Sequence, residues 1–291
     1  DEANACVADC LKEGPANLNV RVELIAALAR AKEYDTAMAR LDAWIQAVTG
    51  GPAARKPATT SRPVGDTTTV LAWCRETTVR VLVMKKEYDK AIARASEYLN
   101  DVPNNVDLLR LRSSALNEAR QPAKALEDMR KMYKLQPDFS GHWNNLGYQL
   151  ADLGLELTEA EKLIRRSLVA IGPSSINYVP PLDSLAWSLY KQGKLHAAGK
   201  VFLEVIRRSR EQKYSHPILF DHAGDGFYRL GWTAKAVDLW TKAVKLAAED
   251  KTDAREVLDV RRETPGKIKA VKAGKSARVA PLGKGVKIED K

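Results

Sequence analysis

The segment Lys32-Glu33-Tyr34-Asp35-Thr36-Ala37 returns almost unchanged as Lys86-Glu87-Tyr88-Asp89-Lys90-Ala91. Aligning the chain on the final alanine of this segment gives the series Ala3, Ala37, Ala91, Ala125, Ala160, Ala198 and Ala236. The successive spacings are 34, 54, 34, 35, 38 and 38 residues, which is a basic period of 34 with insertions. A fixed period of about 20–50 residues is typical of repeat architectures, in which each unit buries its apolar face only against its neighbours.

Apolar residues keep a constant distance from each alanine and predict helices. One set precedes the alanine by nine or ten residues and another follows it by four: Leu28, Leu82, Leu116, Leu150, Leu189 and Phe227, then Leu41, Ala95, Met129, Ile164, Phe202 and Trp240. An offset of four places side chains on one helical face. A turn is predicted about five residues before the alanine, at Lys32, Lys86, Arg120, Gly154, Gly193 and Gly231, and glycine there suits a helix C-terminal cap. Each unit therefore reads as helix, turn, helix.

This pattern resembles the tetratricopeptide repeat, most clearly at Trp143-Asn144-Asn145-Leu146-Gly147-Tyr148, followed by Gly154 and Ala160. The resemblance implies an all-α fold, a right-handed α-solenoid of helix–turn–helix repeats. We expect six units at about 18–51, 72–105, 106–139, 140–174, 179–212 and 217–250, with a proline- and glycine-rich loop insert at 50–68. Residues 1–17 fit the second helix of a truncated repeat, so we expect the chain to be the C-terminal piece of a longer solenoid.

The C-terminal region combines a cap and a basic arm. We expect capping helices over 251–273, one from Asp253 to Arg262 and a short one that Pro265 restarts and that runs to Lys272. Residues 274–291 read as a basic extended tail. Residues 251–291 hold 12 Lys and Arg against 6 Asp and Glu, a balance of +6. This balance is more than half of the net charge of +10. The positive charge is therefore concentrated in residues 251–291 rather than in the repeats.

The composition excludes several classes of protein. No run of 18 apolar residues is present, so no membrane-spanning helix is predicted, and residues 1–5 do not read as a signal peptide. Three cysteines, Cys6, Cys10 and Cys74, do not form a disulfide framework, and Cys6 and Cys10 are expected to be buried rather than metal ligands.

No catalytic grouping is recognisable. Gly274-Lys275-Ser276 lacks the earlier glycine and the preceding strand of a phosphate-binding loop. The four histidines have no metal or nucleophile spacing and are expected at the surface or at helix caps: His142, His196, His216 and His222. We therefore expect no enzyme activity, no cofactor and no metal.

The resemblance also indicates where a partner would bind, because ligands of the repeat family lie on the concave face made by the first helix of each unit. It places there the candidate partner-binding residues Arg110, Asn144, Asn145, Tyr148, Asp183, Trp187, Tyr190, Asp225, Tyr228 and Arg229. Exposed rings and amides are what a peptide anchor site needs. The alternative is that these rings pack between neighbouring units or against the tail. Glu76, Asp183 and Asp221 argue against the subfamily that binds acidic C-terminal tails.

The sequence favours a scaffold that binds a protein or peptide segment, and it leaves two other functions open. The basic tail could bind an anionic polymer, either a nucleic acid or an envelope polymer, or the chain could be the accessory region of a larger enzyme. The tail could also be only a solubilising arm, or Val279-Ala280-Pro281-Leu282 could lie back in the groove as a pseudo-ligand. The last three units resemble bacterial repeat proteins, many of them exported, which slightly favours a periplasmic location over a cytoplasmic one.

Overall fold

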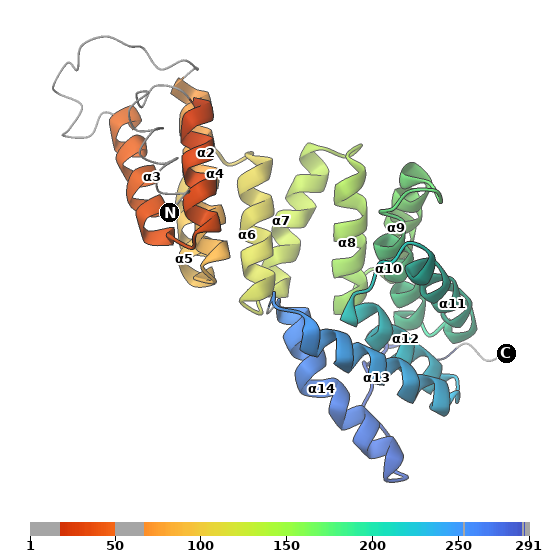
Figure 1. The fold of residues 1–291 in the computed structure, drawn as a ribbon. Helices are drawn as coiled ribbons and strands as arrows, with labels where there is room; N and C mark the ends of the chain where they lie inside the picture. Colours follow the sequence, from red (N-terminus) through yellow and green to blue (C-terminus); the bar gives the residue numbers. More distant parts are fainter. Residues whose placement is uncertain (1–17, 50–66, 253, 287, 289–291) are drawn as a thin grey trace. The chain divides into compact units, whose positions relative to one another are not determined.

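The computed structural model describes residues 18–49, 67–252, 254–286 and 288, and every regular element within these residues is a helix. The chain divides into two compact units, residues 1–121 and 122–291. The described part of the first unit comprises α2 (Leu18–Arg30), α3 (Tyr34–Thr49), α4 (Thr67–Met84), α5 (Tyr88–Asp101) and α6 (Val106–Glu118) (Figure 1). The second comprises α7 (Pro122–Leu135), α8 (Ser140–Leu153), α9 (Leu157–Ile171), α10 (Val179–Lys191), α11 (Leu195–Glu211), α12 (Pro217–Arg229), α13 (Thr233–Glu249) and α14 (Arg255–Lys272). The predicted all-α fold is confirmed.

Three sequence predictions concern residues outside this description. The predicted helix at 1–17, with Cys6 and Cys10, lies outside the described residues, and so do residues 50–66 of the predicted insert. Residues 67 and 68, which we assigned to that insert, are instead the first residues of α4.

The alanines of the register lie in the packed faces of the helices, and within the two units α2 contacts α3, α4 contacts α5, α8 contacts α9, α10 contacts α11 and α12 contacts α13. All six described alanines of the series, Ala37, Ala91, Ala125, Ala160, Ala198 and Ala236, are 0% exposed. A methyl group is small enough to let a neighbouring helix approach closely. Most of the residues four positions later are also buried, so the predicted apolar face is the face that packs.

The six predicted turns share one backbone conformation. Lys32, Lys86, Arg120, Gly154, Gly193 and Gly231 all have positive φ, between 58° and 79°. At the last of them Gly231 N–H donates to Tyr228 O at 3.0 Å and Trp232 N–H to Phe227 O at 2.9 Å. This is the pair of bonds that closes a helix C-terminus with a left-handed residue.

The first helices of successive pairs lie against one another within each unit. In the first unit α4 contacts α6, and in the second unit α8 contacts α10 and α10 contacts α12. A continuous hydrophobic core runs through the second unit, and C-terminal residues pack against it, among them Ala277, Val279, Ala280 and Leu282. The free cysteine Cys74 is buried in the core of the first unit, where burial raises the pKa of its thiol to about 11.

The C-terminal cap differs from the prediction of two short helices, because α14 is one helix that continues through Pro265. A proline in a helix interior removes a backbone hydrogen bond and disfavours the helix. Tertiary contacts on both sides of Pro265 offset this cost. Thr264 and Lys267 are buried and both bind Asp221 of α12.

Candidate functional site

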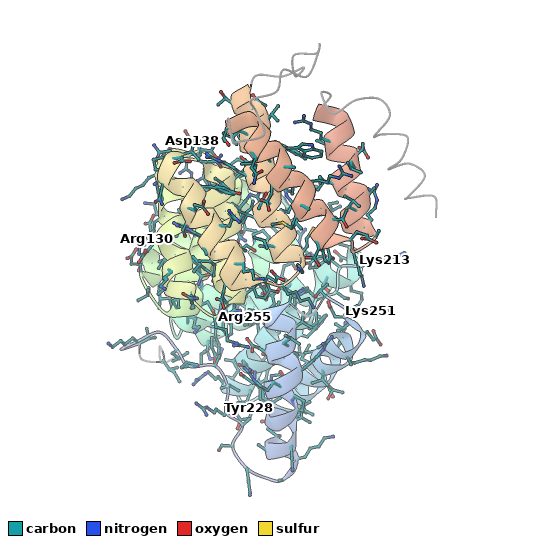
Figure 2. All side chains as sticks on the ribbon, turned by 90° about the vertical axis from the view of Figure 1, so that its left-hand side faces the viewer. Arg130, Asp138, Lys213, Tyr228, Lys251 and Arg255 are labelled. Atoms are coloured by element: carbon teal, nitrogen blue, oxygen red, sulfur yellow. The ribbon has the colours of Figure 1, made fainter. Side chains whose placement is uncertain are left out.

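The C-terminal segment, defined as residues 277–283, lies against the first helices of the last repeats. Its backbone N–H groups are held at three points: Ala277 donates to Tyr228 Oη at 2.9 Å, Ala280 to Asp225 Oδ2 at 2.8 Å, and Gly283 to Lys191 O at 2.8 Å. In Figure 2 the labelled Tyr228 lies among the C-terminal elements of the chain. The segment therefore runs across α10 and α12.

One carbonyl of the segment is recognised twice. Ala280 O accepts hydrogen bonds from the Tyr190 hydroxyl and from Arg229 Nη2, the latter at 2.9 Å. Arg229 Nε also donates to Tyr190 Oη at 2.6 Å, which fixes the phenol in place. Burial and the nearby Asp225 carboxylate raise the pKa of Tyr190, so its hydroxyl remains a donor at neutral pH. Both polar groups of Ala280 are thus satisfied by side chains of the repeats.

A stack of three rings lies beneath this contact. The centroid of Trp187 is 3.9 Å from that of His222 and 4.9 Å from that of Tyr190, with the planes within 12° of parallel. His222 Nδ1 lies 2.9 Å from Asp183 Oδ2, and Trp187 Nε1 donates to Asp152 Oδ1 at 3.2 Å. The stack joins α8, α10 and α12 through polar contacts as well as through ring packing.

The titration of His222 follows from this setting. Burial disfavours the charged imidazole, but the charge and hydrogen bond of Asp183 outweigh it and raise the pKa of His222. The side chains of both residues are about 95% buried, so the pair is screened from solvent.

A buried cation connects α14 to the same site. Lys267 Nζ lies 2.6 Å from Asp225 Oδ1 and 3.0 Å from both carboxylate oxygens of Asp221. Burial alone would lower the pKa of Lys267, but the Asp225 and Asp221 carboxylates raise it. Asp225 also accepts from Trp240 Nε1 at 3.0 Å, so one carboxylate ties together α13, α14 and the C-terminal segment.

An open cavity of about 770 Å³ lies beside the segment, bounded by α8, α10, α12, α14 and the segment itself. Tyr148 and Ile218 contribute to its lining, and Figure 2 labels Arg255 at the start of α14. Acidic side chains outnumber basic ones in the lining: Asp152, Asp221, Asp225, Glu256, Asp259 and Glu263 against Arg255, Lys267 and Arg278. Four of these carboxylates are paired with cations: Asp221 and Asp225 with Lys267, and Asp259 and Glu263 with Arg262.

The structure brings most of the predicted partner-binding residues together, but several of them are buried rather than exposed as expected. Asp183, Trp187, Tyr190 and Asp225 are at most 4% exposed, so the expectation of exposed rings is wrong for Trp187 and Tyr190. Their rings are covered because they stack on one another and on His222. These contacts match the predicted alternative, in which the rings pack between neighbouring repeats or against the tail. The segment's backbone is held by Tyr190, Asp225, Tyr228 and Arg229.

The other predicted residues have less to do with this site. Asn144 is half-buried with a buried Oδ1 that has no hydrogen-bond partner, and Asn145 is exposed. Arg110 belongs to the first unit, where it is exposed and pairs with Asp107 at 2.8 Å.

Sequence reasoning missed two residues of the site. The expectation of surface or capping histidines is wrong for His222 and also for His142, which are 3% and 5% exposed. The available signal for His222 was its place beside Ala223 and two residues after Phe220, both of which are buried in α12. Lys267 was counted as one of the 12 Lys and Arg of residues 251–291, but it is 8% exposed and paired with Asp221 and Asp225, so it is not available to an anionic polymer.

Residues 18–49, 67–252, 254–286 and 288 offer neither a metal site nor a membrane-spanning helix. No group of three or more His, Cys, Asp or Glu side chains there could hold a metal ion. Within the same residues, none of the helices has the length and apolar character needed to cross a bilayer.

Comparison with known proteins supports the fold. No family model matches the chain. The TPR repeat-containing protein PA4667 of Pseudomonas aeruginosa is 31% identical over 124 residues, which is 42% of this chain and 20% of that protein. The chain thus spans about a fifth of the length of the curated relative that it matches.

Solved structures extend the likeness over more of the chain. A tetratricopeptide repeat protein from Parabacteroides merdae aligns with a TM-score of 0.61 at 16% identity, covering 87% of this chain and 86% of that one. A thermophilic TPR protein from Thermus thermophilus aligns with a TM-score of 0.50 at 16% identity, covering 67% of this chain and 97% of that one. The resemblance that the repeat register indicated is confirmed: this chain has the all-α tetratricopeptide-repeat fold and is similar in sequence to a bacterial protein of that kind.

Proposed function

We propose that the chain is a protein-binding scaffold whose groove, formed by α8, α10 and α12, takes an extended segment of a partner protein. The observation that carries the proposal is the C-terminal segment itself. Tyr190, Asp225, Tyr228 and Arg229 together bind three backbone groups of an extended polypeptide. Hydrogen bonds to the main chain of a peptide give a binding groove its affinity, and pockets for the peptide's side chains give its specificity.

The side chains of the site are preorganised for binding. The rings and the carboxylates are fixed by Trp187, Lys267 and their partners, so little side-chain entropy is lost when a segment binds. A preorganised groove binds more tightly than one that must order itself. No step of the proposal needs a nucleophile, a metal or a cofactor.

A photo-crosslinking amino acid at position 218 tests the proposal. Ile218 lines the cavity beside the segment, so a partner in the groove will lie within reach of the crosslinker. The matched control places the same amino acid at position 169, because Val169 lies on α9 and is 84% exposed. We expect a discrete protein adduct from position 218 in an extract of the source cells and none from position 169.

Salt distinguishes the proposed mode from binding of an anionic polymer. Main-chain hydrogen bonds in a groove respond weakly to salt, whereas contacts to phosphates weaken steeply as counterions are restored. The adduct should persist from 50 to 300 mM salt, concentrations of the order used to vary counterion release. Loss of the adduct with salt, or the same adduct from both positions, contradicts the groove proposal.

A further inference from the structure

We propose that residues 277–283 act as a built-in competitor and display the pattern of the segment that the groove takes. In the chain the segment from Ala277 to Gly283 reads small–basic–apolar–small–proline–apolar–glycine, and the positions that contact the repeats define the pattern. This inference rests on the proposed function and names the chemistry of the partner.

The spacing of the contacts supports an extended occupant. The three backbone donors of the segment belong to Ala277, Ala280 and Gly283, so one N–H group in every three is bound. Three residues per turn is the repeat of the polyproline II helix, whose backbone groups point outward and are free to bind. Pro281 fixes its own φ and biases Ala280 towards the extended region. The sequence of the segment therefore favours an extended conformation even before the segment binds to the groove.

The groove also selects residue sizes. A Cβ at Gly283 would lie 2.5 Å from Leu157 Cδ1 and 3.1 Å from Lys191 O, so only glycine fits without a shift of the neighbours. Val279 and Leu282 are half-buried against the core of the second unit, while Arg278 and Pro281 are exposed. The groove therefore favours apolar side chains at the third and sixth positions of the segment and glycine at the seventh.

The second position of the segment faces solvent. Arg278 lines the cavity but is exposed, and the lining carboxylates Asp221 and Asp225 are already paired with Lys267. The second position of a partner segment is therefore not restricted in charge.

Attachment to the same chain makes the segment a strong competitor. It follows α14 directly, through the left-handed Gly274 and the exposed Lys275 and Ser276. A ligand on a short tether has an effective concentration in the millimolar range, so a free segment of equal intrinsic affinity must overcome it.

The test uses a fluorescent peptide of residues 276–284 and the full chain. In one variant, Ala277→Pro/Ala280→Pro/Gly283→Pro, the three donor N–H groups are removed from the chain's own segment while the groove is left intact. We expect the peptide to bind this variant at least about tenfold more tightly than the wild-type chain, because the tethered competitor is weakened. Adding Arg229→Met to the variant should abolish the gain, and a peptide with Gly283→Leu should not bind.

Equal peptide affinity for the wild-type chain and the proline variant overturns the inference, as does no binding to either. If hydrogen exchange shows that the proline variant has lost the fold of α10 and α12, Gly283→Ala alone replaces it, with an expected gain of about threefold. A partner adduct at position 218 without peptide binding would leave the proposed function standing and overturn this inference. Peptide binding without any adduct would contradict the proposed function and, with it, the partner pattern inferred from the segment.

Discussion

Six turn residues of the repeats adopt the left-handed backbone, and three of them are lysine or arginine rather than glycine. A left-handed backbone costs a residue other than glycine about 1–2 kcal/mol. This cost can be measured by itself where an added Cβ would contact no neighbouring atom. At Gly231, with φ at +79°, an added Cβ would meet no atom within 4 Å. Gly231→Ala should therefore destabilise α12 and α13 by about 1–2 kcal/mol through the backbone alone, measured by hydrogen exchange of their amides.

Gly266→Ala is the matched control for that substitution. It lies within α14, its φ is not positive, and an added Cβ would again meet no atom within 4 Å. It should stabilise α14 by about 0.5–1 kcal/mol, because alanine loses less entropy than glycine in a helix. Equal effects of the two substitutions would contradict the argument from backbone conformation.

The buried pair of His222 and Asp183 predicts a pH dependence of stability. The pKa of His222 is raised above the ordinary value of 6.5. The stabilisation by charged His222 should therefore be complete below pH 6.5 and should be lost as pH rises through the raised value. Hydrogen exchange of α10 and α12, corrected for the intrinsic pH effect, should show this loss in the wild-type chain and not in His222→Gln. His196→Gln, at an exposed histidine, should leave the loss unchanged.

At the scale of elements, α14 is joined to α12 by Lys267 between Asp221 and Asp225. Lys267→Met leaves two carboxylates without their cation and should destabilise the contact by about 3–5 kcal/mol at neutral pH. Burial already raises the pKa of Asp225, and loss of the cation would raise it further. The deficit should therefore shrink as pH falls and the carboxylates take up protons.

Hydrogen exchange of α14 measures this effect across pH. Lys269→Met is the control, because Lys269 is exposed on the same helix and should change stability by no more than about 0.5 kcal/mol. A deficit of the same size at all pH values would indicate lost packing rather than unpaired carboxylates.

At the scale of the whole molecule, the two compact units predict a local response to loss of the C-terminal segment. The variant Ala277→Pro/Ala280→Pro/Gly283→Pro removes three hydrogen bonds that reach α10 and α12. Amide protection of these helices should fall, while α4 and α5 of the first unit keep theirs, because local opening follows cooperative units. Hydrogen exchange with mass spectrometry resolves the two regions, and an equal loss in both would contradict the division.

The sequence by itself determined the pairs of helices, the turns between them and the alanines that they pack on. These features follow from a local period, because Ala160, Gly154 and Leu150 lie within one repeat. Offsets of three and four residues place side chains on one face of a helix. The resemblance to the tetratricopeptide repeat also placed Tyr190, Asp225, Tyr228 and Arg229 among the candidate partner-binding residues.

Only the tertiary structure decided what those residues contact. Tyr190 meets the carbonyl of Ala280, 90 residues further along the chain, and that carbonyl belongs to the backbone, which carries no sequence signal. Lys267 is buried because two carboxylates of α12 surround it, and no pattern on its own helix records their position. A periodic sequence specifies the faces of its helices, but the contacts of a non-repeating segment depend on where the folded repeats leave room and unsatisfied polar groups.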